Sequence, residues 1–162
     1  MNFFKTPYQS PLGTLQIVCS DDALCSLTFL NENENGEQTE SNRLTQATGE
    51  QLDEYFAGRR KVFQLPILQS GTTFQSKVWE LLQAIPYGKS ISYMDLSKTY
   101  GDAKAIRAVA AANGKNNLAI IVPCHRVIGS NQSLTGYAGG LWRKQWLLHH
   151  EAKFHAGVQS LF

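Results

Sequence analysis

Residues 118–129 read LAIIVPCHRVIG, and this is the most informative segment of the 162-residue chain. The apolar run 118–122 predicts a buried strand, and Pro123 restricts the backbone that leads into Cys124. The cysteine is followed directly by His125 and then by an arginine. Because a thiol becomes nucleophilic when a base or a cation stabilises its thiolate, Cys124 is a candidate nucleophile. Adjacent side chains often point apart, so an inert buried thiol is the alternative.

Short helices are predicted upstream of this segment. Ser92 and Asp95 form a capping box for a helix that ends before Gly101, and the next helix covers residues 103–112. Two short helices joined by a glycine turn indicate a helix-turn-helix. The second helix reads AKAIRAVAAA, with Arg107 as the only large polar residue in its middle. Its small side chains fit either insertion into a groove or tight packing in a core.

The first half of the chain is predicted to contain mostly strands. Residues 3–6, 14–18 and 24–29 predict three strands of an antiparallel meander, and residues 44–56 predict a helix that ends at Gly58. The polar, acidic residues 31–41 predict a mobile surface loop, and residues 62–65 predict a short strand. A helix capped by Thr73 opens the second half. The sequence therefore predicts an α+β fold, with an N-terminal antiparallel sheet and a C-terminal, mostly helical part.

The composition indicates a globular protein. The chain is 43% hydrophobic with a net charge of +2, which is ordinary for a globular protein. It has no apolar run of membrane-spanning length and no secretory signal pattern, and three cysteines do not make a disulfide scaffold, so we expect a cytoplasmic protein. Residues 1–70 hold five basic and nine acidic side chains, whereas residues 71–162 hold ten and four. We expect these two ranges to be separate domains, and the basic one to bind a polyanion unless the asymmetry is only an uneven surface.

Several motifs in the second half resemble those of one known family. Residues 73–151 are similar to the O6-alkylguanine-DNA alkyltransferases, and PCHRV at 123–127 matches that family's active-site signature. The resemblance implies a ribonuclease H-like N-terminal domain and a winged-helix-like C-terminal domain with a helix-turn-helix. The other motifs that follow the family's order and spacing are ISY (91–93), AIRAV (105–109), Asn116, GY (136–137) and WLLHHE (146–151).

The resemblance implies an irreversible DNA repair reaction. The protein would flip an O6-alkylguanine out of duplex DNA and transfer the alkyl group to its own Cys124, with O4-alkylthymine as a second substrate. Each molecule would react once, because a thioether is a poor leaving group. The family implies a monomer that needs no cofactor and binds the minor groove of double-stranded DNA, with no membrane partner.

The family's catalytic residues carry over to five positions. Cys124 matches the acceptor thiol, and His125 matches the base that deprotonates it through a water. Glu151 matches the carboxylate that orients the imidazole, and Asn116 matches the hinge asparagine between the helix-turn-helix and the active-site turn. Tyr93 matches the tyrosine that crowds the flipped nucleotide's phosphate and gives a proton to the departing base.

The family's DNA-binding and pocket residues carry over in the same way. Arg107 matches the arginine that fills the gap left by the flipped base, and a helix of small residues such as Ala105 and Ala108 suits a minor groove only about 6 Å wide. The pocket would use the Val127 carbonyl and the Ala138 backbone N–H. The remaining expected contacts are Tyr137 in the pocket, Lys104 and Arg126 on DNA, and Lys77, Lys115 and Arg143 on phosphates.

One feature of some family members is not expected here, and the sequence leaves three alternative functions. No structural metal site is expected, because Cys19 and Cys25 have no histidine partner before residue 125. Alkyltransferase-like damage sensors bind alkylated DNA without repair, but they replace the signature cysteine that this chain keeps. A cysteine hydrolase would turn over an ester or an amide. A transcriptional regulator of the adaptive-response type would need further DNA-binding domains.

Overall fold

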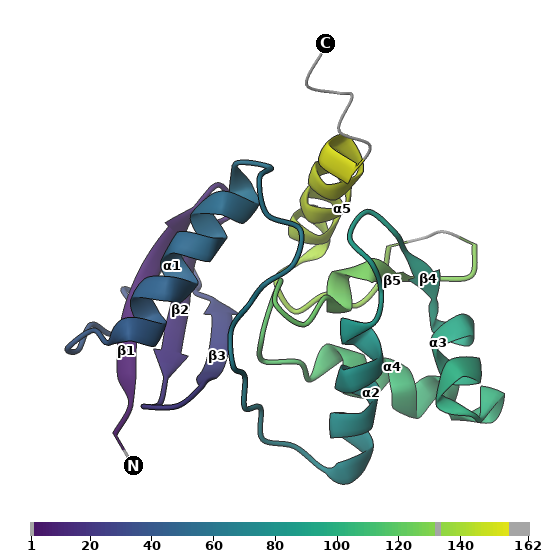
Figure 1. Cartoon of the computed structure of the whole chain (residues 1–162). Coiled ribbons are helices and arrows are strands. Elements are labelled where there is room, and N and C mark those ends of the chain that lie inside the picture. Colours follow the sequence, from purple (N-terminus) through teal and green to yellow (C-terminus); the bar gives the residue numbers. More distant parts are fainter. Residues whose placement is uncertain (1, 132–133, 156–162) are drawn as a thin grey trace. The chain divides into compact units, whose positions relative to one another are not determined.

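The computed structural model describes residues 2–131 and 134–155 and divides the chain into two compact units (Figure 1). Unit 1 is Met1–Ser70 together with Asn117–Ala119, and unit 2 is Gly71–Asn116 together with Ile120–Phe162. In the described part of the chain, no helix has the length and apolar character needed to cross a bilayer.

Unit 1 is a three-stranded antiparallel sheet covered by one helix. Strands β1 (Phe4–Ser10), β2 (Gly13–Cys19) and β3 (Leu24–Phe29) pair in the order β1-β2-β3, and a tight turn places Ser10 opposite Gly13. Helix α1 (Arg43–Phe56) buries Thr45, Thr48, Leu52 and Tyr55. Leu44 and Ala47, which are apolar residues of the same helix, are only half-buried.

The acidic segment 31–41 is tied to the sheet. The Gln16 side chain accepts from the Glu37 N–H and donates to the Glu37 carbonyl, while Thr39 exchanges hydrogen bonds with the Lys5 backbone. Lys5 also forms an ion pair of 2.6 Å with Glu37. The prediction of a mobile loop missed these contacts because they depend on side chains more than 20 residues away.

Two predicted strands are wrong. Residues 62–65 form no strand, and in this region only Ile67 makes an isolated parallel bridge, to Leu24. Residues 118–122 contribute a single bridge between Leu118 and Leu27, and then turn at Ile120, whose φ is +72°. A short apolar run shows that a segment is buried but not which backbone conformation it takes, which explains both errors.

Unit 2 is built from helices around a small apolar core. The helices are α2 (Thr73–Gln83), α3 (Tyr93–Tyr100), α4 (Ile106–Gly114) and α5 (Leu141–His155). Their buried apolar side chains include Val78 and Leu82 of α2, Leu96 of α3, Val109 of α4 and Leu147 of α5. The N-cap of α2 is Thr72, one residue before the predicted cap. The predicted capping box of Ser92 and Asp95 is confirmed at the start of α3.

Helices α3 and α4 form the helix-turn-helix. Gly101 ends α3 in the left-handed region with a φ of +109°. The Asp102 side chain then caps the 3₁₀ turn η1 (Ala103–Ala105), so that α4 begins three residues later than predicted. Glycine adopts a positive φ without steric strain, so a glycine after a helical segment predicts the position of this turn from the sequence.

A two-residue parallel ladder places the nucleophile segment beside α3. Strand β4 (Ile91–Ser92) pairs with β5 (Val127–Ile128), which puts Ile91 opposite Val127. Because β4 leads directly into α3 and β5 directly follows the 3₁₀ turn η2 (Cys124–Arg126), the ladder fixes the start of α3 against that turn.

Candidate active site

The candidate nucleophile lies in the turn η2, which neighbouring elements hold in place. Cys124 begins the turn and is 8% exposed. Asn116, just after α4, donates from Nδ2 to the Val122 carbonyl at 2.8 Å. Asn113, in the last turn of α4, donates to the Cys124 carbonyl at 3.5 Å. The end of the second helix of the helix-turn-helix is thereby connected to the backbone of the nucleophile.

His125 and Glu151 form a buried pair next to this cysteine. The His125 side chain is inaccessible to solvent, and its Nε2 lies 2.7 Å from Oε2 of Glu151 on α5. An ionised carboxylate can only accept, so Nε2 carries the hydrogen and Nδ1 keeps the lone pair. That Nδ1 atom is buried and has no hydrogen-bond partner among the described residues. The imidazole therefore presents a free basic nitrogen inside the protein.

Burial and neighbouring charges determine the protonation states of Cys124, His125 and Glu151. Burial raises the pKa of Cys124, although a hydrogen bond from Asn116 and the charge of Lys144 oppose the shift. Burial also lowers the pKa of His125 despite its carboxylate partner, so the imidazole is neutral near pH 7. Burial alone would raise the pKa of Glu151, but His125 and the neighbouring arginine hold it well below its usual range. The resting site is thus a thiol beside a neutral base that an ionised carboxylate orients.

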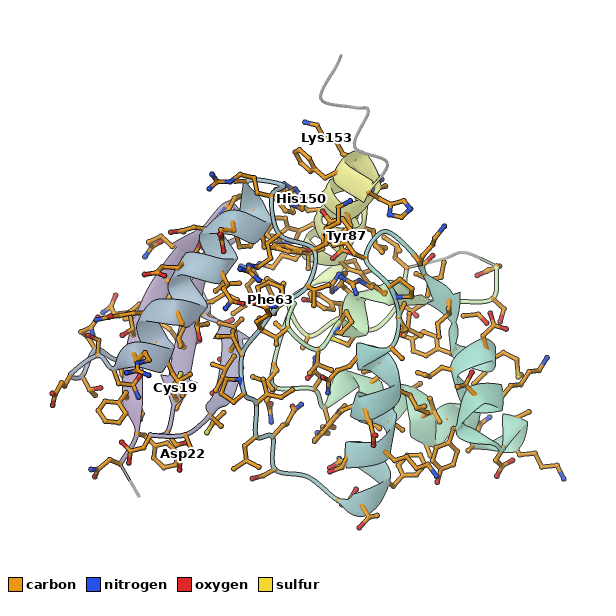
Figure 2. The ribbon with its side chains drawn as sticks, viewed as in Figure 1. Cys19, Asp22, Phe63, Tyr87, His150 and Lys153 are labelled. Carbon is orange, nitrogen blue, oxygen red and sulfur yellow. The ribbon has the colours of Figure 1, made fainter. Side chains whose placement is uncertain are left out.

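Arg126 is part of this buried network, and the prediction that it contacts DNA is wrong. Its side chain is 6% exposed; Nε and Nη2 donate to Glu151 at 2.8 and 3.1 Å, and Nη1 donates to the Ile85 carbonyl at 2.7 Å. Its guanidinium carbon Cζ lies 5.7 Å from the centre of the Tyr87 ring. Tyr87 is labelled in Figure 2. The sequence could not reveal this, because it does not tell which way a side chain in a short turn points.

The expected pocket residues lie on α3, at the start of β5 and in the segment before α5. Tyr93, the first residue of α3, lies with its hydroxyl 3.4 Å from the Thr135 carbonyl. Val127 is fully buried in β5, whereas Ala138 is exposed in the turn before α5. Burial, followed by the charge of Cys124, raises the pKa of Tyr137 well above its usual value, which places this phenol near the sulfur.

The expected DNA-binding residues of the helix-turn-helix lie at its surface. Arg107 and Ala108 are exposed on α4, Lys104 is exposed in η1, and Ala105 is half-buried. Of the expected phosphate contacts, Lys77 and Lys115 are exposed. Arg143 instead donates to the Gly139 carbonyl at 2.8 Å and lies over the Trp142 ring.

One buried charge near the cysteine was missed from the sequence. Lys144, on α5, is completely buried and donates from Nζ to the Thr135 carbonyl at 2.8 Å. Its charge acts on Cys124, as described above. Lys144 precedes Glu151 by seven residues, which is two helical turns and therefore the same face. A lysine spaced in this way from a buried carboxylate is the signal that could have identified it.

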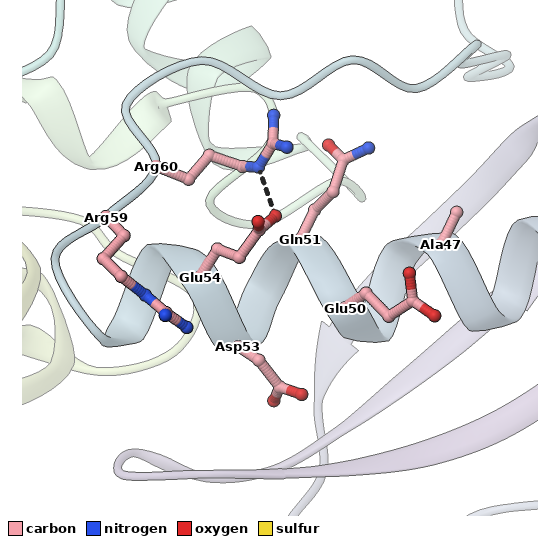
Figure 3. Close-up of a pocket in the computed structure, with 7 residues that line it drawn as sticks. All are labelled: Ala47, Glu50, Gln51, Asp53, Glu54, Arg59 and Arg60. Atoms are coloured by element: carbon pink, nitrogen blue, oxygen red, sulfur yellow. Dashed lines mark hydrogen bonds and ion pairs between the residues drawn. The ribbon is translucent and has the colours of Figure 1, made fainter.

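No other part of the described chain offers the same chemistry. Burial raises the pKa of Cys19 to about 11, and a hydrogen bond from Thr48 only partly offsets this (Figure 2). No group of three or more histidine, cysteine or acidic residues within residues 2–131 and 134–155 could hold a metal ion. Unit 1 has an open cavity of about 490 Å³ (Figure 3). Its lining residues include no nucleophile: Ala47, Glu50, Gln51, Asp53, Glu54, Arg59 and Arg60.

The chain is similar to known proteins over almost its whole length. Residues 3–69 match the ribonuclease-like domain of 6-O-methylguanine DNA methyltransferase, and residues 73–153 match its DNA binding domain. The constitutive methylated-DNA–protein-cysteine methyltransferase of Bacillus subtilis is 48% identical over 147 residues, covering 86% of this chain and 88% of the relative. A methylated-DNA–protein-cysteine methyltransferase of Mycolicibacterium paratuberculosis is 42% identical and covers 94% of each chain.

The chain is also similar to solved structures of such methyltransferases. The crystal structure of Mycobacterium tuberculosis O6-methylguanine methyltransferase has a TM-score of 0.85 and 38% identity, and covers 94% of both chains. A structure of the Mycobacterium tuberculosis protein in complex with DNA has a TM-score of 0.84 and covers 95% of this chain and 94% of that one. The chain thus belongs to the O6-methylguanine-DNA methyltransferase family, and it repairs O6-methylguanine in DNA by transferring the methyl group to a cysteine.

Proposed function

We propose that Cys124 is the cysteine that accepts the methyl group. The observation that carries this proposal is the adjacent His125, whose Nε2 is held by Glu151 and whose Nδ1 is buried with no hydrogen-bond partner among the described residues. A neutral imidazole held in this tautomer is a suitable general base for a thiol. Neither Cys19 nor Cys25 has a histidine next to it in the sequence, and burial disfavours the thiolate of Cys19.

The reaction is a single displacement at the methyl carbon. His125 takes the thiol proton, directly or through one water, and the sulfur electron pair forms a bond to that carbon. The bond from carbon to O6 breaks, its electron pair stays on guanine, and Tyr93 supplies the proton that lets guanine leave as a neutral base. Solvent returns a proton from the imidazolium to the phenolate. The product thioether is stable, so each molecule reacts once.

Access to the sulfur requires the damaged base to leave the helix. Because Cys124 is 8% exposed, a guanine inside duplex DNA cannot reach it without being flipped. We assign α4 to the minor groove, where Ala108 allows close approach and Arg107 occupies the space left by the base. The DNA complex of the similar Mycobacterium tuberculosis protein supports DNA binding in general terms.

The proposal also covers a second substrate, the oligomeric state and the location in the cell. We include O4-alkylthymine as a substrate, because it presents an alkyl group on an equivalent exocyclic oxygen. The protein acts as a monomer in the cytoplasm, where its thiol stays reduced.

A pair of cysteine variants tests the proposal. The variant Cys124→Ala should bind a duplex that contains O6-methylguanine but should take up no methyl group, whereas Cys19→Ala should take up one equivalent. Transfer to the Cys124→Ala protein would refute the assignment. Continued turnover of an ester by wild-type protein would instead favour a cysteine hydrolase.

A further inference from the structure

Lys144 is a buried charge that the reaction described above does not use. Its side chain is fully buried, and the acceptor it contacts in the described part of the chain is one neutral carbonyl, that of Thr135. An ammonium group has three hydrogens and is strongly hydrated in water, so burying it without a carboxylate partner is costly. Burial lowers the pKa of Lys144 to about 8, while the charge of Cys124 opposes that shift. A position this unfavourable needs a compensating role.

The groups that face Lys144 identify its partner. On α3, the centre of the Tyr93 ring lies 5.7 Å from Nζ of Lys144. In η2, the charge of Lys144 lowers the pKa of both Cys124 and His125. Glu151 lies on the same face of α5 but is already bound to His125 and Arg126. Among the groups facing Lys144, the Cys124 thiol is therefore the one that becomes negative during the reaction, and the charge of Lys144 lowers its pKa.

Resting on the proposed role of Cys124, we propose that Lys144 is the electrostatic partner of the acceptor sulfur, and that the Thr135 carbonyl holds its ammonium in position for the thiolate that forms during transfer. A fixed charge in a dry site stabilises a developing charge far better than one in water. The same positive charge opposes protonation of His125, which keeps the imidazole ready to accept the thiol proton.

The hydrogen bond to Thr135 connects this charge with the pocket loop. The Thr135 carbonyl accepts from Lys144 at 2.8 Å and lies 3.4 Å from the Tyr93 hydroxyl. The adjacent Gly136 has a φ of +56°, and a Cβ there would lie 3.8 Å from that hydroxyl. The loop that leads to Ala138 thus positions the cation and contacts the phenol at one point.

Two variants of Lys144 separate a role in charge from a role in packing. Lys144→Met keeps the length of the side chain and removes the charge, whereas Lys144→Arg keeps a charge. The readout is the pH dependence of Cys124 alkylation by iodoacetamide, which needs neither DNA nor base flipping. In Lys144→Met, we expect the midpoint to move about one pH unit upward, and the rate at pH 7 to fall about tenfold, with the same rate on the alkaline plateau. Lys144→Arg should keep a midpoint at or below that of the wild type.

Exposed Lys98, at the end of α3, provides the control. Lys98→Met removes a charge from the same unit and should leave the profile unchanged. An unchanged midpoint in Lys144→Met would overturn the proposal, even if its rate were lower at every pH, because lost packing changes the rate without moving the titration.

A second measurement needs no substitution. The Lys144 ammonium can be titrated by NMR in wild-type protein before and after methylation of Cys124 by iodomethane. Because a thioether cannot carry the negative charge that raises the pKa of Lys144, this pKa should fall on methylation. An unchanged or higher value would refute the pairing. Failure of the proposed function would appear separately, as a wild-type protein that reacts with iodoacetamide but takes no methyl group from DNA.

Discussion

Glu151 shows how much one residue can determine at the candidate site. Its carboxylate accepts from His125 at 2.7 Å and from two nitrogens of Arg126. It therefore fixes the imidazole tautomer and balances a buried guanidinium at the same time. The resemblance to a known family identified Glu151, His125 and Cys124 from the sequence, because their spacing is specific. It misplaced Arg126 and missed Lys144, because the direction of a buried side chain depends on packing that the sequence does not display.

The variant Glu151→Gln tests the orienting role. The carboxylate raises the pKa of His125, so its removal makes the imidazole a weaker base and the imidazolium–thiolate pair less stable. We expect single-turnover methyl transfer at pH 7 to fall about 10- to 100-fold, and the midpoint of its pH profile to move to higher pH.

The exposed carboxylate of Glu80, on α2, gives a matched control, and Glu80→Gln should behave as wild type. The comparison is made at a temperature where circular dichroism shows both variants to be folded, since Arg126 loses its charged partner in Glu151→Gln. An unchanged pH profile in folded Glu151→Gln would remove Glu151 from the proton transfer.

Whole elements were predictable wherever a local signal specified them. The capping box at Ser92 and the glycine after α3 marked the helix-turn-helix, because caps and a positive φ depend on residues within one turn. The strands expected at 62–65 and 118–122 failed, because pairing partners decide whether an apolar run becomes a strand. The docking of segment 31–41 on β1 and β2 was likewise invisible to local reasoning.

Two glycines of the helix-turn-helix give a prediction about the fold. A Cβ would meet nothing within 4 Å at either Gly101 or Gly114, but only Gly101 has a positive φ, of +109°. Gly101→Ala should lower the free energy of unfolding by about 1 kcal/mol, because alanine is strained there. Gly114→Ala, at the end of α4, should not lower it, and should raise it by up to about 1 kcal/mol. Urea unfolding measures both, and equal effects would contradict the assigned turn geometry.

Arg107 gives a prediction about the function of α4. Its side chain is exposed on α4, whereas His125 and Glu151 are buried, so Arg107→Ala should leave the reaction with free O6-benzylguanine unchanged. Repair of O6-methylguanine in duplex DNA should slow by at least about tenfold, because no side chain then replaces the flipped base. Rapid-quench kinetics on the two substrates provide the comparison. Equal losses on both would show that Arg107 does not act in flipping.

At the scale of the whole molecule, the uneven charge between the two halves of the sequence is the main indication of a polyanionic partner. Residues 71–162 carry ten basic and four acidic side chains, and Lys77, Lys104, Arg107 and Lys115 are exposed in the structure. The sequence predicted the fold class and this asymmetry, because both follow from composition and periodicity. It did not predict that Asn117–Ala119 belongs to unit 1, because that requires the pairing of Leu118 with Leu27.

This charge distribution predicts the salt dependence of binding. If about three to five phosphates are neutralised, the logarithm of the affinity for duplex DNA should fall with the logarithm of salt concentration at a slope of about −3 to −5. Fluorescence anisotropy over a range of salt concentrations measures this slope. The reaction with free O6-benzylguanine is the control, and it should vary little with salt. A slope near zero would exclude phosphate contacts as the basis of binding.

The identity of the acceptor cysteine is best tested by mass spectrometry of the protein after reaction. Wild-type protein is incubated with excess duplex that contains O6-methylguanine, weighed intact and then digested. We predict that each molecule gains the mass of one methyl group in place of hydrogen, and that the peptide with Cys124 carries it. A methyl group on Cys19 or Cys25, or removal of methyl groups from DNA with no gain in protein mass, would contradict this account.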